Sequence, residues 1–158
     1  MMCRKFELKG NEAENKYEPT LGCRIIEIEK LGEVEKKVEL WDVSGDEEYE
    51  NCWPAILSGT AGDTVDGVIL VFDPNRLGQR EEIKHWYHYF VSKPGMVENK
   101  CMILVHESFL SDTPPSSSAI YNLPQELQTE CEVRQTSIEK PEVLLRTVSD
   151  FIRTISTQ

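Results

Sequence analysis

The chain has 158 residues, and its 17 basic and 28 acidic side chains give a net charge of −11. This length predicts one domain, large enough to bury a sizeable core. The acidic balance argues against nucleic-acid partners and against electrostatic attachment to anionic membranes, because both need clustered lysine and arginine. Hydrophobic residues make up 39% of the chain, which favours a folded core over disorder.

The N-terminal part predicts a hairpin after a weakly patterned start. Residues 1–16 are polar, and we expect them to be poorly ordered. The β-branched content of residues 23–29 predicts a strand, and the alternation over residues 37–41 predicts a second one. Residues 30–36, with a central glycine, form the turn between them. The two strands therefore make an antiparallel hairpin.

The middle of the chain predicts a short helix followed by a buried strand. Residues 47–57 space their large apolar side chains as one face of a helix does, although Pro54 interrupts the pattern. Residues 58–66 hold two glycines and read as a loop. The run over residues 67–72 is apolar on both faces, which predicts a strand covered by helices on either side.

In the C-terminal half, helices and strands alternate. An apolar stripe predicts a helix over residues 80–92, and residues 101–105 predict a buried strand. We expect a loop over residues 107–122, an edge strand over 129–135 and a final helix that begins at Pro141. The whole chain, residues 1–158, is therefore predicted to be a single α/β domain with a mostly parallel sheet and helices on both faces.

The end of the second strand carries the most informative motif. The run Asp42-Val43-Ser44-Gly45 follows an alternating strand, and a buried apolar strand comes about twenty residues later. In guanine-nucleotide switches, a strand that ends in Asp-x-x-Gly senses the terminal phosphate: the aspartate holds a water of Mg²⁺, and the glycine N–H approaches a phosphate oxygen. Alone the motif is weak, because these residues also cap helices and form turns.

Such a switch also needs the phosphate cradle G-x-x-x-x-G-K-[ST]. None of the 9 glycines in this sequence is followed by lysine. The motif that senses phosphate is present, and the motif that grips it is missing.

Six segments between residues 17 and 105 carry a recognisable pattern, and the first includes a Thr-x-Gly motif of the switch I kind at Thr20. They are Tyr17–Gly22, Arg24–Glu27, Trp41–Asp46, Cys52–Ala55, Trp86–Val91 and Cys101–Leu104. Together they resemble one family, the Rab-like small GTPase subunit of the intraflagellar transport B complex (Rab-like protein five type). The resemblance implies a small-GTPase-like fold of the P-loop class that lacks the first strand and the P-loop, as in an N-terminally truncated member.

Departures from the family bear on activity. Active Rabs place a glutamine after the switch glycine to orient the attacking water, and Asp46 stands there in this chain. The guanine-reading Asn-Lys-x-Asp should follow the strand over 101–105, where the chain reads His106-Glu107-Ser108-Phe109. We therefore predict no catalytic residue. The absent first strand would also leave two open strand edges, and we expect a marginal fold in isolation.

The resemblance implies a GTPase-like, non-catalytic adaptor in ciliary transport and assembly. Its partners would be the coiled-coil subunits of the transport B complex, and its location the cytoplasm and the cilium, at the ciliary base and the axoneme. The alternative is a GTP-binding, slowly hydrolysing switch whose P-loop is missing from this chain. Nucleotide would then lie against Thr20, Asp42 and Gly45, with GTP and Mg²⁺ bound only if a longer form supplied the P-loop.

The segment of residues 41–57 also predicts a protein interface. It crowds large apolar side chains into a region that is normally exposed in such folds, and aromatic anchors commonly mark interfaces. The predicted partner-binding residues are Trp41, Tyr49, Trp53 and Ile56. The alternative for Trp53 is that it packs under the sheet.

No metal site is predicted. His85 and His88 lie three apart on the predicted helix, but no third ligand accompanies them, so a solvated helix face is the favoured interpretation. The 5 cysteines form no C-x-x-C pair, which predicts reduced thiols in the cytosol. With no membrane-spanning run and no prenylation motif, we expect no direct membrane anchor.

Overall fold

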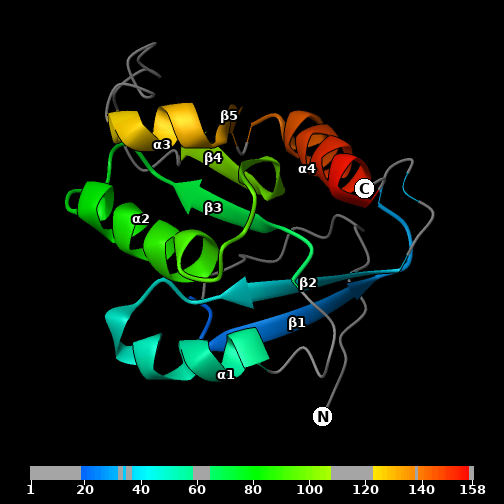
Figure 1. The fold of residues 1–158 in the computed structure, drawn as a ribbon. Coiled ribbons are helices and arrows are strands. Elements are labelled where there is room, and N and C mark those ends of the chain that lie inside the picture. Colours follow the sequence, from blue (N-terminus) through cyan, green and yellow to red (C-terminus); the bar gives the residue numbers. More distant parts are fainter. Residues whose placement is uncertain are drawn as a thin grey trace.

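The computed structural model describes residues 19–31, 34, 37–58, 65–107, 123–137 and 139–156. Its elements are drawn in Figure 1 and alternate between strands and helices after an initial hairpin. They are β1 (Cys23–Ile28), β2 (Val38–Val43), the 3-10 helix η1 (Glu47–Cys52), α1 (Trp53–Ser58), β3 (Val68–Phe72), α2 (Gln79–Tyr87), the π-helix η2 (His88–Ser92), the 3-10 helix η3 (Glu98–Lys100), β4 (Cys101–Glu107), α3 (Gln125–Glu130), β5 (Glu132–Ser137) and α4 (Pro141–Ser156).

The strands form two separate sheets. β1 and β2 pair antiparallel, with Cys23 opposite Val43 and Ile28 opposite Val38, so the predicted hairpin is confirmed. The other three strands form a parallel sheet in the order β3-β4-β5. Among the described residues no strand pairing joins β2 to β3. Each of these two strands therefore has one edge without a strand partner in the described part of the chain.

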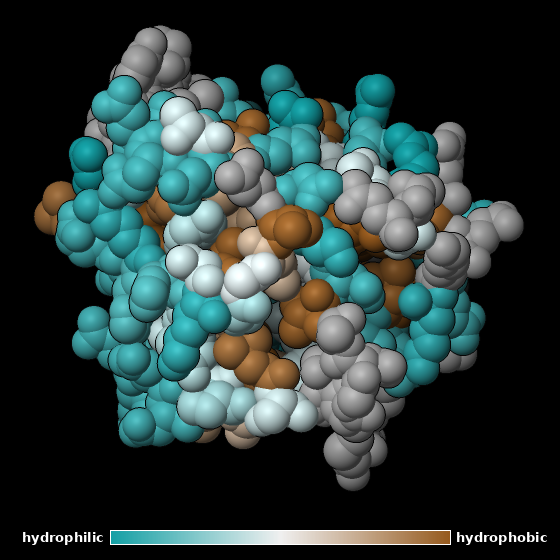
Figure 2. All heavy atoms as spheres, in the orientation of Figure 1, coloured by the Kyte–Doolittle hydropathy of each residue, from teal (hydrophilic) through white to brown (hydrophobic). Residues whose placement is uncertain are grey.

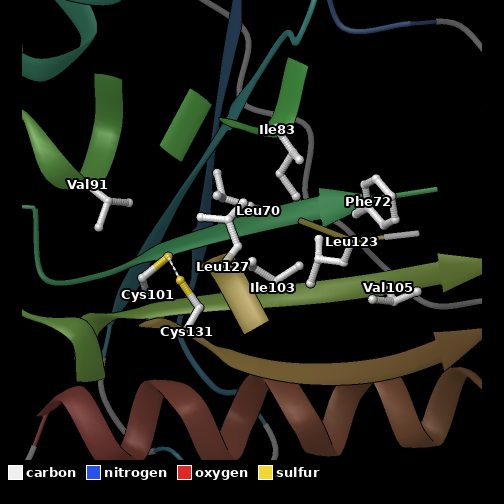
Figure 3. Close-up of a cluster of buried hydrophobic side chains, with 10 residues drawn as sticks. All are labelled: Leu70, Phe72, Ile83, Val91, Cys101, Ile103, Val105, Leu123, Leu127 and Cys131. Carbon is white, nitrogen blue, oxygen red and sulfur yellow. Dashed lines mark hydrogen bonds between the residues drawn. The ribbon is translucent and has the colours of Figure 1, made fainter. Parts of the chain in front are cut away.

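The parallel sheet carries the core, with helices on both faces as the sequence predicts. On one face, side chains of β3, β4 and β5 pack against α2, η2 and α3 (Figure 3). On the other face, Met102 and Leu104 of β4 pack against Phe151 of α4. All of residues 101–105 are buried. The predicted full burial of the strand over 67–72 is wrong, because only Leu70 and Phe72 are buried, and Val71 lies outside both clusters and is 52% exposed.

Several predicted elements are present with shifted ends. The helix predicted over residues 47–57 is η1 followed by α1, and Pro54 lies in the first turn of α1, where its missing N–H breaks no helical hydrogen bond. The helix over 80–92 is α2 continued by η2. The edge strand is β5, which begins at Glu132, because residues 125–130 form α3, a helix that the sequence pattern did not predict.

Some predictions lie outside the described residues. Residues 1–16 belong to this group, and so does most of the loop predicted over residues 107–122, of which only Glu107 is described, as the last residue of β4. In the described part of the chain, no helix is both long enough and apolar enough to cross a membrane.

The hairpin and the η1–α1 segment that follows it contact the helices of the parallel sheet at a few points. Trp53 of α1 packs against rings of α2 and η2, and Gly45 lies directly under the indole of Trp86. At the far end, the Ser149 hydroxyl of α4 donates a hydrogen bond to the Leu31 carbonyl at 3.3 Å. On the face of the molecule that is turned to the viewer in Figure 1, hydrophobic side chains reach the surface over β3 and the hairpin (Figure 2).

Candidate functional site

The Asp-x-x-Gly motif borders a cleft of about 680 Å³ at the carboxyl end of β2. One wall comes from the strand end, with Asp42 and Gly45, and from Thr20 just before β1. The opposite wall comes from Arg76, in the loop after β3, and from Glu82 of α2. The structure therefore brings the three predicted nucleotide-contacting residues, Thr20, Asp42 and Gly45, to one place.

Within the cleft, the two predicted switch residues bond to each other. The Thr20 hydroxyl donates to Asp42 Oδ2 at 2.8 Å, and Arg24 Nη2 donates to the same oxygen at 2.7 Å. The hairpin register places Arg24 directly opposite Asp42, which explains the second contact. One carboxylate oxygen of Asp42 is thus engaged by a hydroxyl and a guanidinium of the same chain.

Sequence reasoning missed Arg24. The signal was available in the hairpin, because a turn centred on position 33 pairs residues whose numbers sum to 66, and 24 and 42 do so. A charged pair directly across two strands is a recurrent stabilising arrangement. The pattern over residues 30–36 could therefore have predicted the contact.

Gly45 and Asp46 have structural roles beside the cleft. A Cβ on Gly45 would lie 2.5 Å from Trp86 Cζ2, so only glycine admits the indole at this distance. The Asp46 carboxylate accepts a hydrogen bond from the Glu48 N–H at 3.0 Å and caps η1. Asp46 is exposed at the position where active Rabs carry glutamine, and there it starts a helix.

The charge of the cleft does not suit a triphosphate. Four carboxylates line it and only one guanidinium, that of Arg76, which pairs with Glu82 at 3.3 Å. The carboxylates belong to Asp42, Asp46, Glu47 and Glu82. A phosphate chain needs N–H donors and cations around it, and the residues present mainly repel it. The described residues therefore do not fit GTP by themselves.

The predicted partner-binding residues divide into two groups. Trp41, Tyr49 and Ile56 are partly buried. Trp53 is 1% exposed, and its ring centroid lies 5.1 Å from that of Tyr89 and 5.0 Å from that of Phe90. Its indole is thus covered by η2, so the alternative of a packed Trp53 agrees with this structure, with a helix rather than the sheet as its cover.

Comparisons with known proteins identify the relatives. No protein-family model matches the chain. It is 37% identical to the Danio rerio intraflagellar transport protein 22 homolog over 114 residues, which are 68% of this chain and 55% of the relative. The GTP-bound crystal structure of T. brucei IFT22 matches with a TM-score of 0.57 at 29% identity, over 84% of this chain and 78% of that one. The GDP-bound structure matches with a TM-score of 0.56 at 27% identity, over 86% and 82%.

The chain is a homologue of intraflagellar transport protein 22. Its fold is accordingly that of a small GTPase of the Rab-like kind, and the resemblance predicted from residues 17–105 is confirmed. The chain spans about half the length of the curated relatives it matches, 55% in the Danio rerio case. The structural match covers 84% of the chain and therefore extends well beyond the parallel sheet.

The histidines of α2 and η2 and the Cys23 thiol form no reactive site among the described residues. His85 Nε2 lies 3.0 Å from Glu50 Oε1, and His88 is exposed. Among the described residues, no three ligating side chains gather into a metal site. Burial, and secondarily the charge of Asp42, raises the pKa of the Cys23 thiol, which makes it a poor nucleophile.

Two further thiols lie together in the core. Cys131 Sγ donates a hydrogen bond to Cys101 Sγ at 3.5 Å, and both side chains are buried (Figure 3). That hydrogen bond, together with burial, raises the pKa of the Cys101 thiol. Both cysteines are free thiols, and they pack as small hydrophobic side chains.

Proposed function

We propose that this chain acts as a non-catalytic, GTPase-like adaptor subunit of the intraflagellar transport B complex. The observation that carries the proposal is the contact between the switch residues: Thr20 and Arg24 both donate to Asp42 Oδ2. In a working switch, the corresponding hydroxyl and carboxylate organise Mg²⁺ and the terminal phosphate. Here a hydroxyl and an exposed guanidinium of the same chain already engage that oxygen. A ligand at this oxygen would have to compete with both donors.

The charge distribution supports the same conclusion. Asp46, Glu47 and Glu82 line the cleft beside the Asp-x-x-Gly motif. An anion entering this cleft meets like charges, and this repulsion opposes both binding and the charge that develops during phosphoryl transfer. This charge distribution favours a non-catalytic binding subunit over a switch that hydrolyses GTP.

The partners we propose are the coiled-coil subunits of the transport B complex, and the location is the cytoplasm and the cilium, at its base and along the axoneme. The names of the homologues support a role in intraflagellar transport. The exposed and partly buried side chains of residues 41–57, including Trp41, Tyr49 and Ile56, are the proposed contact surface. With Trp53 buried, this surface would consist of the outer faces of β2, η1 and α1.

The test measures nucleotide content and partner binding on the same preparation. We expect mass spectrometry of the denatured, purified chain to release no stoichiometric GTP or GDP. We also expect the chain to co-purify with the coiled-coil subunits when co-expressed with them, whether or not GTP is added. Stoichiometric nucleotide in the chain, or partner binding that requires GTP, contradicts the adaptor role.

The alternative is a slowly hydrolysing switch that needs a P-loop from a longer form. It is favoured by one specific observation: the T. brucei relative has been solved both GTP-bound and GDP-bound. In a longer form that carries the P-loop, Asp46→Gln should then raise the turnover of GTP, because glutamine orients water where an ionised carboxylate cannot donate. An unchanged rate would remove the role assigned to Asp46.

A further inference from the structure

A second groove, far from the acidic cleft, has the opposite charge. It lies between β5 and α4, with a volume of about 500 Å³. In Figure 1, β5 lies above β4 and β3, and β2, whose carboxyl end borders the acidic cleft, lies below them. The groove and the acidic cleft are thus on opposite sides of β3 and β4.

Three arginines gather along this groove: Arg134 of β5, and Arg146 and Arg153 of α4. Their side chains are 57%, 86% and 56% exposed, so solvent and partners can reach the guanidinium groups. Only two carboxylates accompany them, those of Glu132 and Asp150. In a chain with a net charge of −11, a lining with more guanidinium groups than carboxylates is a local reversal of sign.

The carboxylates of the groove hold the arginines in place. Arg134 pairs with Glu132 on the same strand, and Arg153 Nη2 lies 2.7 Å from Asp150 Oδ1. Arg146 Nε lies 3.8 Å from Asp150 Oδ2, so the single carboxylate of Asp150 is shared by two guanidinium groups. A guanidinium carries five N–H donors and pairs most strongly with planar carboxylates. The sharing leaves the groove able to accept further carboxylates.

We propose that the groove between β5 and α4 binds an acidic, extended segment of a partner protein. The spacing suits such a segment. Arg146 and Arg153 are seven residues apart on one helix, which corresponds to roughly 10 Å along its axis. Side chains on one side of an extended peptide recur about every 7 Å, so two glutamates on that side can each meet one long arginine side chain.

An apolar position completes the surface. Val143, at the start of α4, lines the groove and is 39% exposed. The methylene groups of a glutamate on the groove side of the peptide could lie against it, since the residues between the glutamates point away from the groove. A nucleic acid fits less well, because a continuous phosphate backbone needs many clustered lysine and arginine side chains, and this groove offers three guanidinium groups.

β5 also offers a free edge beside the groove. It is the last strand of the sheet and pairs with β4 on one side, and among the described residues no strand pairs with its other side. Backbone donors and acceptors therefore border the arginines, which favours an extended partner segment over a helical one. The proposal does not depend on the ciliary role or on the absence of nucleotide.

The test uses a labelled octapeptide of alternating glutamate and valine, with fluorescence anisotropy against the full chain. We expect saturable binding that weakens with added salt, and no binding of the matching lysine–valine peptide. Arg134→Glu/Arg146→Glu should weaken binding at least about tenfold. The matched control, Lys30→Glu/Arg80→Glu, makes the same change of charge on exposed residues outside the groove, and it should bind as the unchanged chain does.

A second measurement covers the case in which the double variant does not fold. In the unchanged chain, the peptide should shift the amide NMR signals of β5 and α4 and leave those of residues 38–43 in place. No saturation at millimolar peptide, equal weakening in both double variants, or shifts confined to other elements would each overturn the proposal. Tighter binding of a single-stranded RNA of the same charge, or full competition by inorganic phosphate, would overturn it in favour of a general anion site.

Discussion

The hairpin and the central strand of the parallel sheet are buried to very different extents. In β4, five consecutive residues, Cys101 to Val105, are at most 4% exposed. In β1 and β2, no residue is fully buried. β4 has a strand on each side and helices on each face, whereas each strand of the hairpin has one strand partner among the described residues. The burial of each strand follows both its position and its composition, because the hairpin strands each carry two charged residues and residues 101–105 carry none.

The acidic cleft lies at the border between these two regions. Thr20, Asp42 and Gly45 belong to the hairpin side, and Arg76 and Glu82 to the side of the parallel sheet. Its shape therefore depends on the few contacts that join the two regions. The predictions below test those contacts and the unequal stability of the regions, from the largest expected effect to the smallest.

Trp53 makes the most extensive described contact between the two regions, so its removal should lower the stability most. We expect Trp53→Ala to lower the free energy of unfolding by about 3–5 kcal/mol, since it removes a buried indole that contacts His85, Tyr89 and Phe90. Chemical denaturation measures the change.

The matched control is Trp53→Phe. It keeps an aromatic ring and removes the indole Nε1, which is buried and has no hydrogen-bond partner among the described residues. We expect it to cost less than about 1.5 kcal/mol. If alanine and phenylalanine are equally mild, Trp53 does not join the two regions. Lost partner binding with unchanged stability in Trp53→Ala would instead make it a contact residue.

Native-state hydrogen exchange should separate the two regions directly. We expect the amides of residues 101–105 to exchange only on global unfolding and those of residues 38–43 to exchange through local opening, at least about 100-fold faster. The open edges of β2 and β3 are the physical reason, because their backbone groups have no strand partner there among the described residues. Equal protection of both strands would show that the hairpin and the sheet form one cooperative unit.

Gly45→Ala should have an intermediate effect. The new methyl group would lie 2.5 Å from Trp86 Cζ2, so the indole or the strand end must move, and we expect a loss of about 1–3 kcal/mol. Trp86→Leu should relieve the clash, so the double variant Gly45→Ala/Trp86→Leu should lose less than the sum of the two single variants. Strict additivity in this cycle would show that Gly45 and Trp86 are not in contact.

Much of the fold was predictable because its patterns are local. The hairpin, the buried strand over residues 101–105 and the final helix from Pro141 each follow from periodicity and breakers. Helix α3 was not predictable in this way, because it is only six residues long and Pro124 precedes it without a side-chain cap. The exposure of Val71 was missed for another reason: an apolar run does not reveal which of its faces a helix covers.

The sequence could name residues that line the candidate cleft, but it could not predict the contacts that these residues make. The Asp-x-x-Gly pattern and the Thr-x-Gly segment named Thr20, Asp42 and Gly45, and all three line one cleft. Sequence spacing could not show that Glu82, far along the chain from Asp42, faces the same cleft, nor that Arg24 holds the Asp42 carboxylate. These contacts depend on how α2 and the hairpin are placed in space.

The smallest expected effect concerns the ion pair that holds the switch aspartate. Arg24 and Asp42 have side chains that are 63% and 40% exposed, so water screens their attraction despite the 2.7 Å contact. We expect a double-mutant cycle with Arg24→Ala and Asp42→Asn to give a coupling free energy of about 0.2–1 kcal/mol, falling as salt is added. The amide oxygen introduced by Asp42→Asn can still accept from the Thr20 hydroxyl, so the cycle isolates the charge. A coupling above about 2 kcal/mol would mean that the pair is shielded from solvent and that the hairpin end of the cleft is as well packed as the parallel sheet.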